Sequence, residues 1–256
     1  MVIKKYDSFI FTHIPKCGGS SFRKYILDAG LSNKIPNHKI YTPGLNGVEN
    51  DKNIRQLSKV ERNQFRKKKV KVLADHSMFG VNQRYKLGLP NPFLYVLFRQ
   101  PVARIISHYN FFHFNQGHGN CKGIQINDLK ISKLENILVE LSNLQVRYLT
   151  GIDKNTGSNV TNHTLLTAIS ALERYFACFG ILERLEESIT ILRQYAPDWL
   201  RFKYDFPKVN VNKKKSYLEP NNKTIAKIKE YNQFDLQLYD YALRLFDLRK
   251  EMFVKK

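Results

Sequence analysis

Cysteine is scarce in this chain, whose 256 positions contain only Cys17, Cys121 and Cys178. No Cys-x-x-Cys pair and no His-Glu-x-x-His pattern occurs, so the spacing favours neither a zinc site nor a disulfide framework. We therefore expect no bound metal, and we expect a protein of the reducing cytoplasm.

Long apolar runs are missing too. None approaches the roughly 18 residues that indicate a membrane-spanning helix, so we expect no integral membrane segment. We also expect no secretory leader, because Lys4 and Lys5 lead directly into an apolar stretch at Phe9. With 43% hydrophobic residues and no internal repeat, the chain is expected to form a single domain over residues 1–256.

Acidic side chains are few, since 22 Asp and Glu face 42 Lys and Arg, and the formal net charge is +20 at pH 7. A charge of this sign attracts polyanions, whether nucleic acids, anionic membranes or acidic glycans. An equally open interpretation is a Lys-rich, solvated surface that serves only solubility.

The chain is organised around the stretch from Phe9 to Phe22, which is typical of an apolar strand, a tight turn and a helix start. The turn contains Lys16 and two glycines, which let the backbone approach a ligand closely, and Ser20 and Ser21 follow at the helix start. Free N–H groups at a helix start bind anions. The stretch therefore predicts a phosphate or sulfuryl site, and the alternative is an ordinary strand–turn–helix with a surface lysine.

Strands and helices alternate along the chain, which favours an α/β fold with a central parallel sheet flanked by helices. Strands are expected at 9–14, 70–74 and 93–98, with a short candidate at 176–180. Helices are expected at 20–29, 52–69, 101–114, 133–149, 161–175, 183–195 and 222–253, and irregular segments at 31–51, 115–128 and 200–222. In such sheets ligands bind beyond the carboxyl ends of the strands, where 15–21, 75–80 and 99–107 all fall.

A second motif follows the strand at 93–98. Arg99 closes the strand, and Ser107 lies eight residues later, well inside the next helix. Both side chains could reach one phosphate, because a guanidinium gives bidentate, charge-assisted hydrogen bonds of about 1.5–3 kcal/mol each.

These two motifs resemble those of sulfotransferases that use 3′-phosphoadenosine-5′-phosphosulfate (PAPS). The lysine of 15–22 precedes the glycines, unlike that of a Walker A loop, and 99–109 has the family's spacing of Arg and Ser. The closest likeness is to carbohydrate sulfotransferases of the heparan sulfate 2-O-sulfotransferase type. The resemblance implies a P-loop-like nucleotide-binding (sulfotransferase) fold, PAPS as donor and 3′-phosphoadenosine-5′-phosphate (PAP) as product.

The resemblance also implies roles for single residues. Lys16 would steady the leaving phosphate, and Arg99 and Ser107 would hold the 3′-phosphate. The 5′-phosphate would lie against the turn formed by Cys17, Gly18, Gly19, Ser20 and Ser21. Cys17 stands where a threonine is common in the family, and we expect it to fit as a small side chain rather than to act in redox chemistry.

His76 is the candidate general base, since a neutral imidazole can take a proton from an acceptor hydroxyl. The stretch 75–80 resembles the base region of the 2-O-sulfotransferase group, although Ala74 replaces a second histidine of that group. The alternative is a structural histidine that caps a loop. Asp75 is expected to be a turn residue, and His13 to fill the core or a loop rather than line the pocket.

Three further features are left open. Gln145 and Arg147 are either ligand contacts or a helical surface pair tied to a neighbouring element. Lys213–Lys215 form either a basic loop that closes over the 3′-phosphate, as in sulfotransferases, or a solvated charge run. The phenylalanines within 111–114 either pack a helix or line an acceptor cleft.

The resulting hypothesis is a cytoplasmic sulfotransferase that moves a sulfuryl group from PAPS to a hydroxyl of a carbohydrate, such as an acidic glycan or glycolipid. Lys16 and His76 are its catalytic residues. One alternative is a nucleotide-dependent kinase, which the missing lysine after the glycines disfavours. The other is a basic nucleic-acid-binding protein, but no reading motif occurs, so we expect no nucleic-acid partner.

Overall fold

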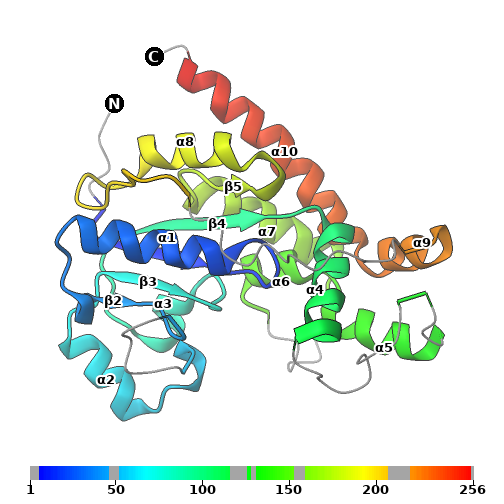
Figure 1. The fold of residues 1–256 in the computed structure, drawn as a ribbon, viewed down its shortest axis with the longest axis horizontal. Coiled ribbons are helices and arrows are strands. Elements are labelled where there is room, and N and C mark those ends of the chain that lie inside the picture. Colours follow the sequence, from blue (N-terminus) through cyan, green and yellow to red (C-terminus); the bar gives the residue numbers. More distant parts are fainter. Residues whose placement is uncertain are drawn as a thin grey trace.

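A parallel sheet lies at the centre of the molecule, with helices on both of its faces (Figure 1). The computed structural model describes residues 6–45, 52–115, 126–127, 131–152, 159–206 and 220–254. The strands are β1 (Ser8–Thr12), β2 (Ile40–Tyr41), β3 (Val72–Asp75), β4 (Pro92–Phe98) and β5 (Gly180–Ile181). The helices are α1 (Gly19–Ser32), α2 (Lys59–Lys67), α3 (Val81–Tyr85), α4 (Pro101–Asn115), α5 (Ile131–Leu141), α6 (Leu144–Thr150), α7 (Asn162–Tyr175), α8 (Leu185–Tyr195), α9 (Asn222–Tyr231) and α10 (Gln233–Val254). Short 3-10 turns lie at Asn37–Lys39, Ile54–Gln56 and Leu182–Arg184.

The strand order is β2-β3-β1-β4-β5, and every pairing is parallel. β1 is central, and its last residue, Thr12, lies opposite Asp75 of β3 and Val96 of β4. All residues of β1 are buried, as expected of a strand covered on both faces. The three segments that follow β1, β3 and β4 therefore meet at one edge of the sheet, and the predicted α/β architecture is confirmed.

Successive side chains of β1 point to opposite faces of the sheet. Phe11 packs against Phe22 of α1, with ring centroids 4.7 Å apart, in the larger hydrophobic cluster. Ile10 belongs to a second cluster, with Phe65 of α2 and Val81 of α3. Burial on both faces holds β1 in place, and with it the turn that follows.

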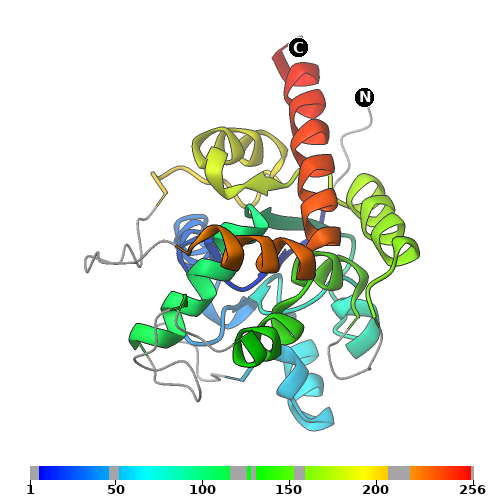
Figure 2. The same ribbon diagram turned by 90° about the vertical axis from the view of Figure 1, so that its right-hand side faces the viewer.

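The C-terminal half of the chain packs onto the same core. Figure 2 shows α10 as a long upright helix whose base meets α6 and α9. β5 extends the sheet, because Ile181 pairs with Phe98 of β4, and the main cluster runs from Phe9 to Phe246. Of the helices that the structure describes, none combines the length and apolar character needed to cross a bilayer.

The predicted helix at 133–149 is wrong, because the chain forms two helices there, α5 and α6. Asn143 separates them with a left-handed backbone, φ 47°, which an α-helix cannot contain. The predicted helical region 222–253 is also divided, at Asn232 between α9 and α10. Periodicity missed both breaks because the apolar pattern continues across them.

Three other boundaries differ from the prediction. The expected loop at 31–51 contains β2, whose two residues are too few to show a pattern. The helix expected at 52–69 is a 3-10 turn followed by α2, because Asn53 and Ser58 each cap a new helix start. The short strand expected at 176–180 lies at Gly180–Ile181. Lys213–Lys215, predicted as a possible closing loop, lie outside the described residues.

Candidate functional site

The turn after β1 has two residues in the left-handed region, Lys16 with φ 67° and Gly18 with φ 77°. Gly18 is the N-cap of α1 and offers no side-chain cap, so the start of the helix suits an anion. A side chain at Gly18 would also come within 2.7 Å of Leu182 Cδ1. Ser20 is exposed and Ser21 buried at this helix start.

Gly19 has a different reason to be glycine. A methyl group there would lie 1.7 Å from Cδ2 of His13, so the imidazole of His13 rests directly against the bare backbone. The sequence suggested that both glycines admit a ligand, whereas the structure shows that Gly19 admits a neighbouring side chain.

His13 also contacts His76. The two rings are stacked with centroids 3.7 Å apart and an interplanar angle of 23°. Nδ1 of His76 lies 3.1 Å from the backbone carbonyl oxygen of His13. A carbonyl can only accept, so Nδ1 carries the proton and donates it, which leaves the lone pair on Nε2. His76 thus has the tautomer that a base acting through Nε2 requires.

Burial keeps both rings neutral. It lowers the pKa of His76 to about 4, with a contribution from the positive charge of Arg23, and the pKa of His13 falls well below its usual value. Arg23 is itself buried in α1, where its Nε donates to the carbonyl oxygen of Ala74 at 3.1 Å. A neutral imidazole at pH 7 can accept a proton, whereas an imidazolium could not.

Asp75 is more than the turn residue predicted. Its side chain is fully buried at the end of β3 and accepts the N–H of Ile54 at 2.7 Å and that of His76 at 2.6 Å. The carboxylate therefore ties the 3-10 turn at Ile54–Gln56 to the sheet and fixes the backbone of His76, rather than its imidazole.

Lys16 and Arg99 meet where β1 and β4 end. Nη1 of Arg99 donates to the backbone carbonyl oxygen of Lys16 at 3.0 Å, which joins the two predicted motifs directly. Nζ of Lys16 lies over the ring of Phe111 in α4, 3.9 Å from its centroid. Burial, and then the charge of Arg99, lowers the pKa of Lys16 to about 8. An anion between these two groups would relieve the repulsion.

Ser107 lies half-buried in α4. The contacts described for Arg99 run to Lys16 and to Gln145, and not to Ser107. The structure thus links the turn after β1 to Arg99 by a direct bond, while Ser107 shares only the β4–α4 segment with it. Within the described part of the chain, no group of three His, Cys, Asp or Glu side chains is placed to hold a metal ion.

A model of the sulfotransferase family matches residues 1–242. The chain belongs to the sulfotransferase family. No curated protein sequence matched the chain. Family membership supports transfer of a sulfuryl group as the general chemistry, and a central parallel sheet flanked by helices is the fold expected of such a sulfotransferase.

In this sulfotransferase Cys17 is a buried, neutral thiol. Its Sγ donates to Oε1 of Gln145 at 3.8 Å, and burial raises the pKa of Cys17 to about 12. Redox chemistry needs a lowered thiol pKa, so the packing role expected from the sequence is the better interpretation.

Gln145 is not on the surface, as one interpretation of the sequence had it. It is fully buried at the start of α6, and its Oε1 also accepts the backbone N–H of Arg99 at 3.0 Å. The N–H groups of Gln145 and Val146 donate in turn to the carboxylate of Asp235 in α10, at 3.0 and 2.9 Å. Sequence reasoning missed Asp235, because no local pattern links it to α6.

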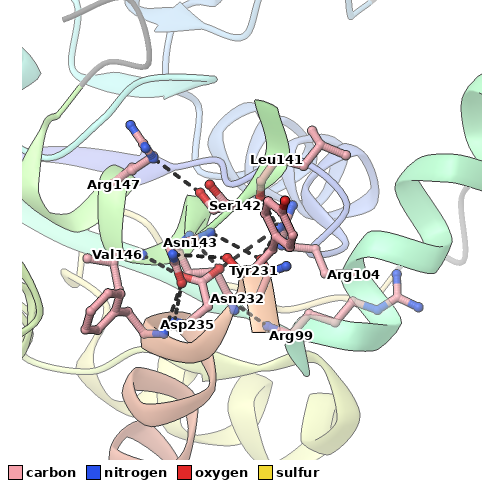
Figure 3. A network of polar contacts seen from close by, with 12 residues as sticks. Arg99, Arg104, Leu141, Ser142, Asn143, Val146, Arg147, Tyr231, Asn232 and Asp235 are labelled. Carbon is pink, nitrogen blue, oxygen red and sulfur yellow. Dashed lines mark hydrogen bonds and ion pairs between the residues drawn. The ribbon is translucent and has the colours of Figure 1, made fainter. Parts of the chain in front are cut away.

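Arg104 is a second residue that the sequence did not single out. Although it lies between Arg99 and Ser107, it is fully buried and points into the network of Figure 3. Its Nη2 donates to the carbonyl oxygen of Leu141 at 2.7 Å and lies 4.0 Å from Oδ2 of Asp235. Burial raises the pKa of Asp235 and the charge of Arg104 opposes this, so the arginine offsets part of the cost of a buried carboxylate.

Proposed function

We propose that the protein transfers a sulfuryl group from PAPS to a hydroxyl group of an acceptor. The observation that carries the proposal is the bond between the Arg99 guanidinium and the Lys16 carbonyl, which brings the two phosphate motifs together. Membership of the sulfotransferase family supports the same chemistry in its general form.

The residues present suit a donor with two phosphate groups. The open start of α1 and the charge of Lys16 suit the 5′-phosphosulfate, and Arg99 with Ser107 suits the 3′-phosphate. During transfer the bond between sulfur and the 5′-phosphate oxygen breaks, and negative charge collects on PAP. Lys16 would stabilise this charge, as cations do in phosphoryl transfer.

We propose His76 as the general base. As the bond between the acceptor oxygen and sulfur forms, the hydroxyl proton passes to the free Nε2 of His76. The hydrogen bond from Nδ1 to the His13 carbonyl supports this assignment, because it holds the ring and stabilises the imidazolium that forms.

We propose a carbohydrate as acceptor, in line with the likeness of 75–80 to the 2-O-sulfotransferase group. The net charge of +20 supports an acidic glycan or glycolipid, since anionic acceptors concentrate near a basic surface. A cytoplasmic site of action is part of the same proposal and rests on the scarcity of cysteine and on the free thiols of Cys17 and Cys178.

Calorimetric titration with PAP, AMP and ATP, without magnesium, tests the donor site. We expect PAP to bind tightly, and AMP and ATP to bind much more weakly. Arg99→Ala should weaken the binding of PAP by at least about ten-fold, because one charge-assisted hydrogen bond is worth about 1.5–3 kcal/mol. Arg201→Ala is the matched control, since it removes the same charge from a side chain that is 64% exposed and forms an ion pair with the nearby Asp198.

Other results of these binding experiments would contradict the donor assignment or favour a different function. A wild-type protein that does not bind PAP would contradict the donor assignment, and ATP binding that needs magnesium would indicate a kinase. Binding of duplex or single-stranded nucleic acid with a steep salt dependence would favour the third hypothesis. If PAP binds, labelled PAPS and a panel of acidic and neutral glycans identify the acceptor, and His76→Gln should keep PAP affinity but lose transfer.

A further inference from the structure

We infer that α10 sets the position of Arg99, and that Gln145 is the positioning residue through which it acts. The inference rests on the proposed function, in which Arg99 holds the 3′-phosphate. It assigns the recognition of that phosphate partly to residues that never touch the nucleotide.

The turn between β4 and α4 is held by side chains. The N–H of Arg99 donates to Oε1 of Gln145 at 3.0 Å, and the N–H of Gln100 donates to Oε1 of Glu183 at 2.9 Å. Two consecutive backbone N–H groups therefore depend on acceptors from distant parts of the chain. The position of the backbone at Arg99 therefore depends on the positions of these two acceptors.

Both acceptors are held by α10. Asp235 accepts the backbone N–H of Gln145, and the hydroxyl of Tyr239 donates to Oε2 of Glu183 at 2.9 Å. Asp235 and Tyr239 lie four residues apart, on one face of the helix. We call this pair the α10 support.

The α10 support is rigid at its base, because α6 and α10 cap each other (Figure 3). Asp235 accepts two N–H groups in the first turn of α6, a favourable place for a carboxylate. In return Oδ1 of Asn143, just before α6, accepts the N–H groups of Phe234 and Asp235 at 3.0 and 3.1 Å. Neither helix start can shift without breaking bonds of the other, so Gln145 is held firmly.

Gln145 also reaches the turn after β1, because the same Oε1 accepts the thiol of Cys17. One amide oxygen thus contacts both proposed phosphate-binding segments, through the backbone N–H of Arg99 and the side chain of Cys17. Loss of this oxygen should loosen Arg99 relative to the turn, and a ligand that carries a 3′-phosphate should be affected most.

The test compares PAP with AMP, which lacks the 3′-phosphate, by calorimetry. The variants are Gln145→Leu and Tyr239→Phe, with Tyr241→Phe as control, because Tyr241 lies on the same helix but bonds Glu173 of α7. We expect the preference for PAP over AMP to fall about ten-fold in Gln145→Leu and several-fold in Tyr239→Phe, and to stay unchanged in the control. A general loss of packing would weaken both ligands equally.

The inference would be overturned if both variants kept the wild-type preference for PAP over AMP. If Gln145→Leu does not fold, the result for Tyr239→Phe alone decides. Amide hydrogen exchange in the free protein separates this inference from the donor assignment. Tyr239→Phe should speed exchange at Gln100 even if PAP proves not to be the ligand. Unchanged exchange at Gln100 would overturn the inference whatever the nucleotide result.

Discussion

At the scale of single residues, burial decides the protonation of the two proposed catalytic groups. His76 must be neutral, and burial lowers its pKa to about 4, while Lys16 must be charged, and burial lowers its pKa to about 8. We expect kcat/KM to rise as the pH passes 4 and to fall as it passes 8, measured with labelled PAPS. Lys16→Arg should remove the alkaline fall, because a guanidinium stays charged. An acid limb near 6.5 would contradict the buried environment of His76.

The same burial links His76 to stability. The unfolded chain protonates this histidine near pH 6.5, but the folded chain does so only near 4, so the unfolded state binds more protons between these values. The free energy of unfolding should be highest above pH 6.5 and fall towards pH 4, by about 1.4 kcal/mol per pH unit for one proton. Urea denaturation across this range should show a shallower fall in His76→Gln.

Gly19 and His13 form a close pair whose cost can be measured. Gly19→Ala places a methyl group where the His13 ring lies, and overpacking of this kind costs about 1–3 kcal/mol. In a protein that already carries His13→Ala the space is free, so the same change should cost almost nothing. A double-mutant cycle by urea denaturation measures the difference. Equal costs in both backgrounds would show that the ring does not determine the need for glycine.

At the scale of elements, the paired starts of α6 and α10 are the feature that periodicity cannot reveal. Asn143 has a left-handed backbone and caps α10 through its side chain. Asn143→Ala should cost about 2–4 kcal/mol, since it loses a cap and strains the backbone. Asn143→Gly should cost less, because glycine takes this backbone freely.

The control for this prediction is Ser58→Ala at the start of α2. Ser58 caps that helix in an exposed capping box, so its loss should cost about 1 kcal/mol. Urea denaturation of all three variants gives the order. The mutual capping would be unimportant if Asn143→Ala cost no more than Ser58→Ala.

At the scale of the whole molecule, one core joins both halves of the chain, from Phe9 to Phe246. We expect residues 1–256 to unfold as one domain in a single transition, seen by calorimetry. PAP at a hundred times its Kd should stabilise the fold by about 2.7 kcal/mol, a rise in Tm of about 5–10 °C for a chain of this size. At the same PAP concentration Arg99→Ala should lose at least about half of this rise, because ten-fold weaker binding leaves about 1.4 kcal/mol. Two separate transitions would contradict the single domain.

Features that depend on neighbouring residues could be predicted from the sequence, whereas features that depend on residues far apart in the chain could not. The turn with Lys16 and Gly18 between β1 and α1 was predictable, because a strand, a glycine turn and a helix start are local patterns. The meeting of this turn with Arg99 was predictable too, since parallel strands end at one edge of the sheet. Gln145 was not, because helical periodicity does not tell which loop a buried side chain will face.

The sequence by itself determined the parallel sheet, the order of its motifs and the chemistry available at its edge. Only the tertiary structure decided that His13 stacks on His76, 63 positions away, and that Asp235 holds Gln145 across 90 positions. Secondary structure depends on neighbours within a few residues, so its signals lie in short stretches of sequence. The protonation of a base and the placing of an arginine depend on which distant side chains pack against them, and packing exists only in the folded chain.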